Sequence, residues 1–215
     1  MSIKLIVNNI FPWPIIAVII LWVLYGLSCI FDNKAIVLLA NKCNVNKYDN
    51  KELIKAFKRY FMFHPLSVYN SDLTVKMIPS LMAENKNILK WVKRINGKDL
   101  HPTILGQLLF SYFVLQENNY AEELKILQHR TSDCFADDKQ FVKIKNYIFG
   151  SQIVSNEEID LINGKYEKAI VYYYLACNAY ARGEIELGDK SFETALLLVP
   201  EKAMSDLLSK RRRLL

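Results

Sequence analysis

The chain has 215 residues, of which 52% are hydrophobic, and its formal net charge at pH 7 is +6. This hydrophobic content exceeds the roughly 45–50% of ordinary globular chains, so part of the apolar sequence serves something other than a soluble core. The basic residues are scattered among acidic ones without a basic stripe or a recognition motif, which argues against nucleic acid as a partner.

The first predicted element is a long apolar helix near the amino terminus. No charged residue occurs between Lys4 and Asp32, a stretch of 27 residues. At about 1.5 Å per residue, residues 14–31 give roughly 27 Å of helix, close to the hydrocarbon thickness of a bilayer. We therefore predict that residues 1–31 contain an uncleaved transmembrane helix that contacts lipid. The alternative is a signal peptide cleaved before Cys29, but the apolar run is longer than such signals carry.

The residues that flank this helix predict its orientation. Lys4 precedes it, and four lysines follow it closely: Lys34, Lys42, Lys47 and Lys51. The excess of positive charge on the carboxyl-terminal side favours a cytoplasmic soluble domain. The cysteines outside the helix are Cys43, Cys134 and Cys177. They form no close pair in the sequence, which suits a reducing compartment, so we expect a single-pass membrane protein with a cytoplasmic domain.

Residues 32–49 are predicted to form a juxtamembrane linker, because an asparagine-rich stretch follows Cys43. Residues 50–100 then form an amphipathic helical segment. Within it, residues 51–63 place apolar side chains at helical spacing beside four cations: Lys51, Lys55, Lys58 and Arg59. Such a helix either rests on a lipid surface or has an ordinary solvated face. Pro79 allows the next stretch to be one helix or two.

From residue 101 onward the sequence pattern predicts helical hairpins. Segments 104–130 and 172–201 each contain two apolar stretches of helical period joined by a short turn. Ser155 and Glu158 have the spacing of a capping box at the start of a short helix. No segment shows sustained period-two alternation, so a sheet is not expected. The predicted fold class is all-α, with a helical domain at residues 101–215.

The hairpin at residues 169–201 places small residues where two helices approach and large residues around them. The small residues are Ala176, Ala179, Gly188 and Ala195, and the large ones are Tyr172, Leu175, Phe192 and Leu196. Gly183 occupies the turn, and Pro200 follows the second helix. This arrangement resembles the tetratricopeptide repeat (TPR), a helix–turn–helix unit of about 34 residues. It departs from the family pattern at Ile185, where an aromatic residue is usual, and at Gly188, where alanine is usual.

The resemblance implies a partner-binding function. One unit cannot bury its own face, so further hairpins should stack on it, and segment 104–130 repeats part of its spacing. In the family, the first helix of each unit lines a groove that receives a peptide or a helix. Carried onto this sequence, the groove residues are Ile170, Tyr173, Cys177 and Tyr180. The alternative is that Tyr173 and Tyr180 are covered by neighbouring helices.

The sequence shows no pattern typical of catalysis. It lacks a glycine-rich phosphate loop and the HExxH, GxSxG and CxxC motifs, so we expect no enzyme activity and no cofactor or metal site. His129 and Cys134 are the nearest approach to a base and a nucleophile, but no activating group accompanies them. Three aspartates, Asp133, Asp137 and Asp138, match no calcium loop, and helix capping explains them sufficiently.

Together these patterns predict a membrane-anchored scaffold or adaptor that binds a peptide or an amphipathic helix of a partner protein. The alternative is a structural or assembly subunit of a membrane complex, in which the transmembrane helix packs against partner spans. The basic carboxyl terminus, KRRRLL, complements the dipole of the last helix, with anionic lipid or an acidic protein surface as the alternative partner.

Overall fold

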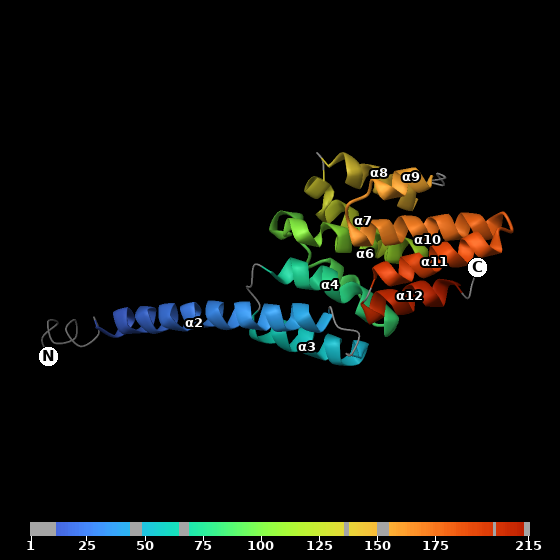
Figure 1. Cartoon of the computed structure of the whole chain (residues 1–215). Helices are drawn as coiled ribbons and strands as arrows, with labels where there is room; N and C mark the ends of the chain where they lie inside the picture. Colours follow the sequence, from blue (N-terminus) through green and yellow to red (C-terminus); the bar gives the residue numbers. More distant parts are fainter. Residues whose placement is uncertain are drawn as a thin grey trace, which may run out of the picture. The chain divides into compact units, whose positions relative to one another are not determined.

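The computed structural model describes residues 12–43, 49–64, 69–135, 138–149, 155–199 and 201–212. Within these ranges every regular element is a helix, which confirms the all-α prediction (Figure 1). The chain divides into two compact units, Met1–Leu38 and Leu39–Leu215. Among the predicted features, the following lie outside the described residues: Lys4, Lys47, Asp137, Pro200 and the last three residues of the KRRRLL terminus.

The first unit contains most of helix α2 (Pro12–Cys43). Pro12 suits the first helical turn, because proline lacks only an N–H that would have no intrahelical partner there. Every side chain from Trp13 to Leu27 is exposed. The helix continues through residues 32–43, so the first part of the predicted linker is helical. None of the helices, as far as their residues are described, combines the length and apolar character that crossing a membrane requires.

The second unit opens with α3 (Asn50–Phe63) and α4 (Asn70–Ala83), which pack against each other. α3 buries one face, made of Leu53, Ile54, Phe57, Tyr60 and Phe61. Pro79 lies inside α4, which ends only at the turn that follows Ala83. The short helix α5 (Leu89–Val92) comes next, and its Trp91 ring lies 5.1 Å from the ring of Phe61, measured between centroids.

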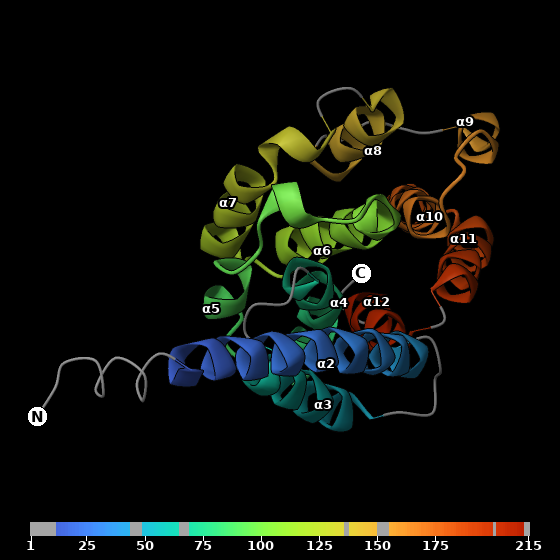
Figure 2. The same cartoon turned by 90° about the vertical axis from the view of Figure 1, so that its left-hand side faces the viewer.

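α6 (Leu105–Glu117) is the central helix of this unit. Helices α4, α7 (Ala121–Arg130), α8 (Lys139–Phe149) and α10 (Lys165–Ala181) all pack against it, as Figure 2 shows. Its residues from Gly106 to Leu115 are buried without interruption. A helix that is apolar on every side needs neighbours on every side, which explains the wide apolar face in the sequence. Three 3-10 turns connect these helices: η1 (Gly97–Asp99), η2 (Pro102–Ile104) and η3 (Ser132–Phe135).

Three helices end in the same kind of left-handed turn. The residues in the left-handed conformation are Asn85, Asn119 and Gly183, with φ angles of 50°, 61° and 77°. In each case the next residue's N–H reaches back to a carbonyl in the last helical turn: Lys86 to Leu81, Tyr120 to Leu115 and Glu184 to Ala179, at 2.8, 3.0 and 2.9 Å. This is a Schellman motif, which satisfies carbonyls that the helix itself leaves unpaired. The α6–α7 and α10–α11 hairpins therefore turn by one mechanism.

The last helices complete the unit. α9 (Asn156–Asp160) begins with the predicted capping box, in which Ser155 Oγ accepts from the Glu158 N–H at 3.3 Å and the Glu158 carboxylate accepts from the Ser155 N–H at 3.3 Å. α10 and α11 (Ile185–Leu198) form a close hairpin, and α12 (Lys202–Arg212) packs back on α4. Asn50 Nδ2 at the start of α3 also donates to Asp206 Oδ2 on α12, at 3.4 Å. The segment 50–100 and the hairpin region therefore share one core.

Candidate partner-binding site

The α10–α11 hairpin packs as its small residues predict. Ala176, Ala179 and Ala195 are fully buried between the two helices. A Cβ atom on Gly188 would lie 2.4 Å from the ring of Tyr180, so this ring occupies the space that an alanine methyl would need. The Tyr180 hydroxyl also donates to Asp189 Oδ1 at 2.8 Å. The glycine at position 188 thus has a local physical reason.

The structure separates the four predicted groove residues into two pairs. Ile170 is 0% exposed and Tyr173 is 1% exposed, whereas Cys177 and Tyr180 are half-buried. The Tyr173 ring lies 4.9 Å from the Phe113 ring of α6 and 6.2 Å from the Phe192 ring of α11, measured between centroids. Because α6 covers this part of α10, the side chain of Tyr173 packs between α6, α10 and α11, and Ile170 is buried on the same helix.

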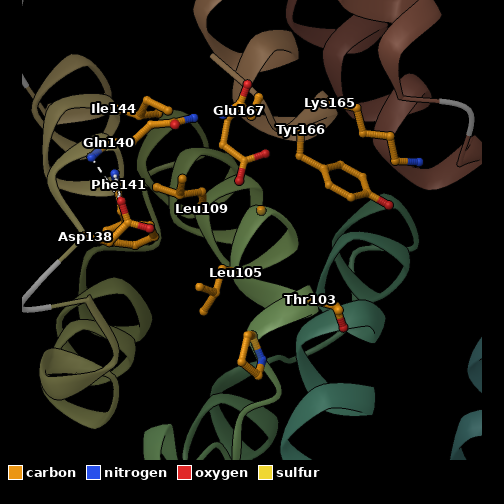
Figure 3. Close-up of a pocket in the computed structure, with 14 residues that line it drawn as sticks. Thr103, Leu105, Leu109, Asp138, Gln140, Phe141, Ile144, Lys165, Tyr166 and Glu167 are labelled. Atoms are coloured by element: carbon orange, nitrogen blue, oxygen red, sulfur yellow. Dashed lines mark hydrogen bonds between the residues drawn. The ribbon is translucent and has the colours of Figure 1, made fainter. Parts of the chain in front are cut away.

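A cavity of about 310 Å³ lies at the amino-terminal end of α10 (Figure 3). It is formed by η2, the start of α6, one face of α8 and the first turn of α10. Its apolar wall consists of Leu105, Leu109, Phe141 and Ile144. The polar groups that bear on its chemistry are Thr103, Asp138 and Glu167. The cavity therefore joins an apolar surface to carboxylates.

Glu167, the third residue of α10, directs its carboxylate into this cavity (Figure 3). Two glycines make room for it. A Cβ atom on Gly164 would lie 1.9 Å from Glu167 Oε2, and one on Gly106 would lie 2.7 Å from the same oxygen. Burial raises the pKa of Glu167 and the nearby charge of Asp138 raises it further, while the hydrogen bond from its own backbone N–H acts in the opposite direction.

Lys165 also lines the cavity, but its ammonium group points towards Glu201 and not towards Glu167. Lys165 Nζ lies 3.4 Å from Glu201 Oε1 and 4.5 Å from the centroid of the Tyr166 ring, and in Figure 3 its side chain points away from Glu167. Within the part of the chain that the structure describes, no ion pair involves Glu167. The carboxylate is therefore available to a cation from outside.

Asp138 has a structural role at the same cavity. Its Oδ1 atom accepts hydrogen bonds from the N–H groups of Gln140 at 3.0 Å and Phe141 at 3.1 Å. These bonds cap the first turn of α8, as the sequence predicted for this aspartate. The capping interaction fixes its negative charge at the edge of the cavity, where it adds to the charge of Glu167.

A buried polar chain holds the first turn of α10 in place. Gln107 Nε2 on α6 donates to the Tyr166 hydroxyl at 2.8 Å, and this hydroxyl donates to Glu201 Oε1. Gln107 and Glu201 are 7% and 6% exposed, so both groups depend on protein partners rather than on water. These hydrogen bonds join α6, α10 and the residue before α12. They hold the first turn of α10, which forms one wall of the cavity, in a single position.

Comparison with protein families, with curated proteins and with solved structures gives no match for this chain. The cavity is therefore interpreted from its own geometry. Sequence reasoning missed it, because its walls come from four separate segments. One local signal was present: Gly164 and Glu167 have capping-box spacing, but the glycine has no side chain to accept from the Glu167 N–H, and the Glu167 carboxylate accepts from that N–H instead.

The structure also describes the thiol considered as a nucleophile. Cys134 Sγ donates a hydrogen bond to the Gly97 carbonyl at 3.3 Å. Burial raises the pKa of the Cys134 thiol, and the charge of Asp133 raises it further, which is opposite to the shift that activates a nucleophilic thiol. Among the residues described, no three His, Cys, Asp or Glu side chains come together as a metal site would require.

Proposed function

We propose that this chain is a membrane-anchored adaptor whose helical domain holds a segment of a partner protein. The cavity at the start of α10 carries the proposal, since it combines a four-residue apolar wall with the carboxylate of Glu167. Its volume of about 310 Å³ is at the lower end for ligand pockets, which suits one or two side chains of a bound segment. The fixed α10 wall keeps this shape before the partner arrives.

The charge of the cavity defines the partner segment more closely. Glu167 directs one carboxylate into the cavity and Asp138 places a second at its edge; burial raises the pKa of Glu167, and the charge of Asp138 raises it further. A lysine or arginine from the partner offsets both charges, and a charge-assisted hydrogen bond of this kind contributes about 1.5–3 kcal/mol. We therefore expect a segment with an apolar side chain beside a basic one.

The TPR-like organisation belongs to the same proposal. Two helical hairpins, α6–α7 and α10–α11, end their first helices with the same Schellman turn. The first helices, α6 and α10, pack against each other. In a repeat array, first helices stack in this way and line the binding surface. The cavity lies at the amino-terminal ends of these two helices, and half-buried Cys177 and Tyr180 lie farther along α10.

The proposal of a membrane anchor is based on the first unit. Its described side chains from Trp13 to Leu27 are exposed and uncharged, over 15 residues. The sequence continues without charge to Phe31, which brings the apolar run to the roughly 18–20 residues that span a bilayer. Extraction of cell membranes at alkaline pH tests this part: we expect the chain to stay in the pellet, and its release into the supernatant would exclude a spanning anchor.

A photo-crosslinking residue at Thr103, an exposed position at the cavity, tests the adaptor function. We expect it to capture one partner, and we expect Glu167→Gln to weaken that capture. The matched control is Glu193→Gln on the exposed side of α11, which changes the net charge equally. Equal capture by both variants, or capture from a crosslinker at position 193 alone, would overturn the assignment of the cavity.

The exposed apolar surface of α2 favours one second candidate, a subunit of a membrane complex. Leu21 and Trp22 are 65% and 78% exposed, and large side chains of this kind also pack against partner spans. Replacing residues 10–31 with an unrelated transmembrane helix separates the two functions. An adaptor keeps its cavity-dependent partner after the replacement, whereas a subunit that assembles through its span loses the complex.

A further inference from the structure

The exposed face of α3 is strongly basic. It presents four cations and one carboxylate: Lys51, Lys55, Lys58, Arg59 and Glu52. None of the four cations forms an ion pair with another residue in the described part of the chain. The opposite face of α3 is buried against the core, which fixes the direction of these charges. The helix therefore holds a row of unneutralised positive charge in water.

Two large apolar side chains continue this exposed face at its carboxyl-terminal end. Met62 is 67% exposed and Phe63 is 65% exposed. The turn after α5 adds a further cation near this end, since the Arg94 guanidinium lies 5.7 Å from the centroid of the Phe61 ring and 5.1 Å from that of the Trp91 ring. The surface thus combines cations with exposed apolar groups at the end of one helix. We call Lys51, Lys55, Lys58, Arg59, Met62 and Phe63 the α3 surface.

We propose that the α3 surface binds the head groups of an anionic lipid bilayer. The four cations lie over lipid phosphates and carboxylates, while Met62 and Phe63 enter the boundary between head groups and acyl chains. The apolar face of α3 is buried in the core, so the cations and not that face supply most of the attraction to the bilayer. Clusters of four or more lysines and arginines on a helix bind anionic lipid in this way. Nucleic acid and acidic proteins also carry negative charge, but protection that depends on the lipid composition of a vesicle, as tested below, is expected only of a lipid-binding surface.

This inference goes beyond the adaptor function, because it gives the helical domain a second attachment to lipid. Each basic side chain near an anionic surface strengthens binding about fivefold, so the four cations together account for roughly a six-hundredfold increase, and the three that are substituted below for roughly a hundredfold. The attraction is electrostatic and therefore falls as salt screens it. A neutral bilayer supplies only the small apolar contribution of Met62 and Phe63.

The test uses the full chain reconstituted with vesicles of phosphatidylcholine alone or of phosphatidylcholine mixed with phosphatidylserine. Vesicles are floated, and an amine-reactive reagent then labels accessible lysines, which mass spectrometry quantifies one by one. We expect Lys51, Lys55 and Lys58 to be protected only in the anionic vesicles, with the protection lost at high salt. Lys125 on α7 and Lys190 on α11, both exposed, serve as internal controls.

A variant checks that the cations cause the protection. In Lys55→Gln/Lys58→Gln/Arg59→Gln we expect Lys51 to lose its protection, whereas Lys125→Gln/Lys190→Gln leaves it unchanged. Equal labelling of Lys55 and Lys58 in both kinds of vesicle overturns the α3 proposal and leaves the anchor standing. Flotation with anionic vesicles alone supports the α3 surface and contradicts the anchor, and flotation with neither kind overturns both.

Discussion

The phenolic hydroxyl of Tyr166 donates a hydrogen bond to the carboxylate of Glu201, which ties the first turn of α10 to the start of α12. The same hydroxyl accepts a hydrogen bond from Gln107. Tyr166→Phe leaves both buried groups with one partner fewer, so we expect the free energy of unfolding to fall by about 1–3 kcal/mol. Urea denaturation measures the change. Tyr172→Phe on the same helix is the control, and an equal loss in both variants would show that the polar chain is not responsible.

The contact between Tyr180 and Gly188 predicts that Gly188→Ala lowers the free energy of unfolding in the wild-type chain but raises it in a Tyr180→Ala variant. In the wild-type chain, Gly188→Ala forces the Tyr180 ring to move and breaks its bond to Asp189, an overpacking cost of about 1–3 kcal/mol. In a Tyr180→Ala background the same substitution should stabilise α11 by up to about 1 kcal/mol, because alanine favours helix over glycine. Urea denaturation of the wild-type chain, the two single variants and the double variant gives the free energies of this double-mutant cycle. Additive effects would mean that the ring does not fill this space.

The left-handed turn at Gly183 predicts how substitutions there are ranked. Its φ of 77° disfavours side chains, but asparagine adopts the same conformation at Asn85 and Asn119 in this chain. We therefore expect Gly183→Asn to cost little and Gly183→Val to cost about 1–2 kcal/mol or more. Thermal unfolding of the two variants is sufficient to rank them. Because nothing lies within 4 Å of a Cβ atom at this position, a steric clash would not explain the difference.

The half-buried carboxylate of Glu167 predicts a pH dependence of stability. Burial raises its pKa in the folded state above the ordinary value of 4.5, so the folded chain binds this proton more tightly than the unfolded chain. The resulting stabilisation is complete below pH 4.5 and is lost as the pH rises through the folded pKa. Relative to Glu167→Gln, the wild-type chain should therefore lose unfolding free energy across that window. A constant difference between the two chains over this pH range would contradict the burial of the carboxylate.

The Cys134 thiol predicts slow alkylation. Its pKa is raised above the ordinary value of 9.0, and thiolate is the reactive form. At neutral pH we expect iodoacetamide to modify Cys134 more slowly than an unstructured cysteine peptide, with the rate rising into the alkaline range. Mass spectrometry of the peptide that contains Cys134 reports the rate. Fast modification at neutral pH would reopen the question of a nucleophilic role.

The elements that sequence predicted best are those with local causes. The Ser155–Glu158 capping box, the Asp138 cap and the small residues of the α10–α11 hairpin each depend on neighbours a few positions away. The burial of Tyr173 depends on Phe113, which is far from it in sequence, so the periodicity of α10 could not show which of its faces stays open. The cavity was missed for the same reason, since Gly106 and Glu167 meet only after α6 and α10 have packed.

The packing of α12 on α4 has a consequence for biosynthesis. A chain leaves the ribosome from its amino terminus, so α3, α4 and α6 emerge long before the residues of α12 are translated. Met204 and Leu208 of α12 are buried in the finished domain, and α4 is one of the helices that α12 covers. Until α12 has left the ribosome, that side of α4 stays open to water and to other chains. The helical domain therefore cannot complete its fold before α12 emerges, and truncation before residue 202 should yield a chain that needs a chaperone or aggregates.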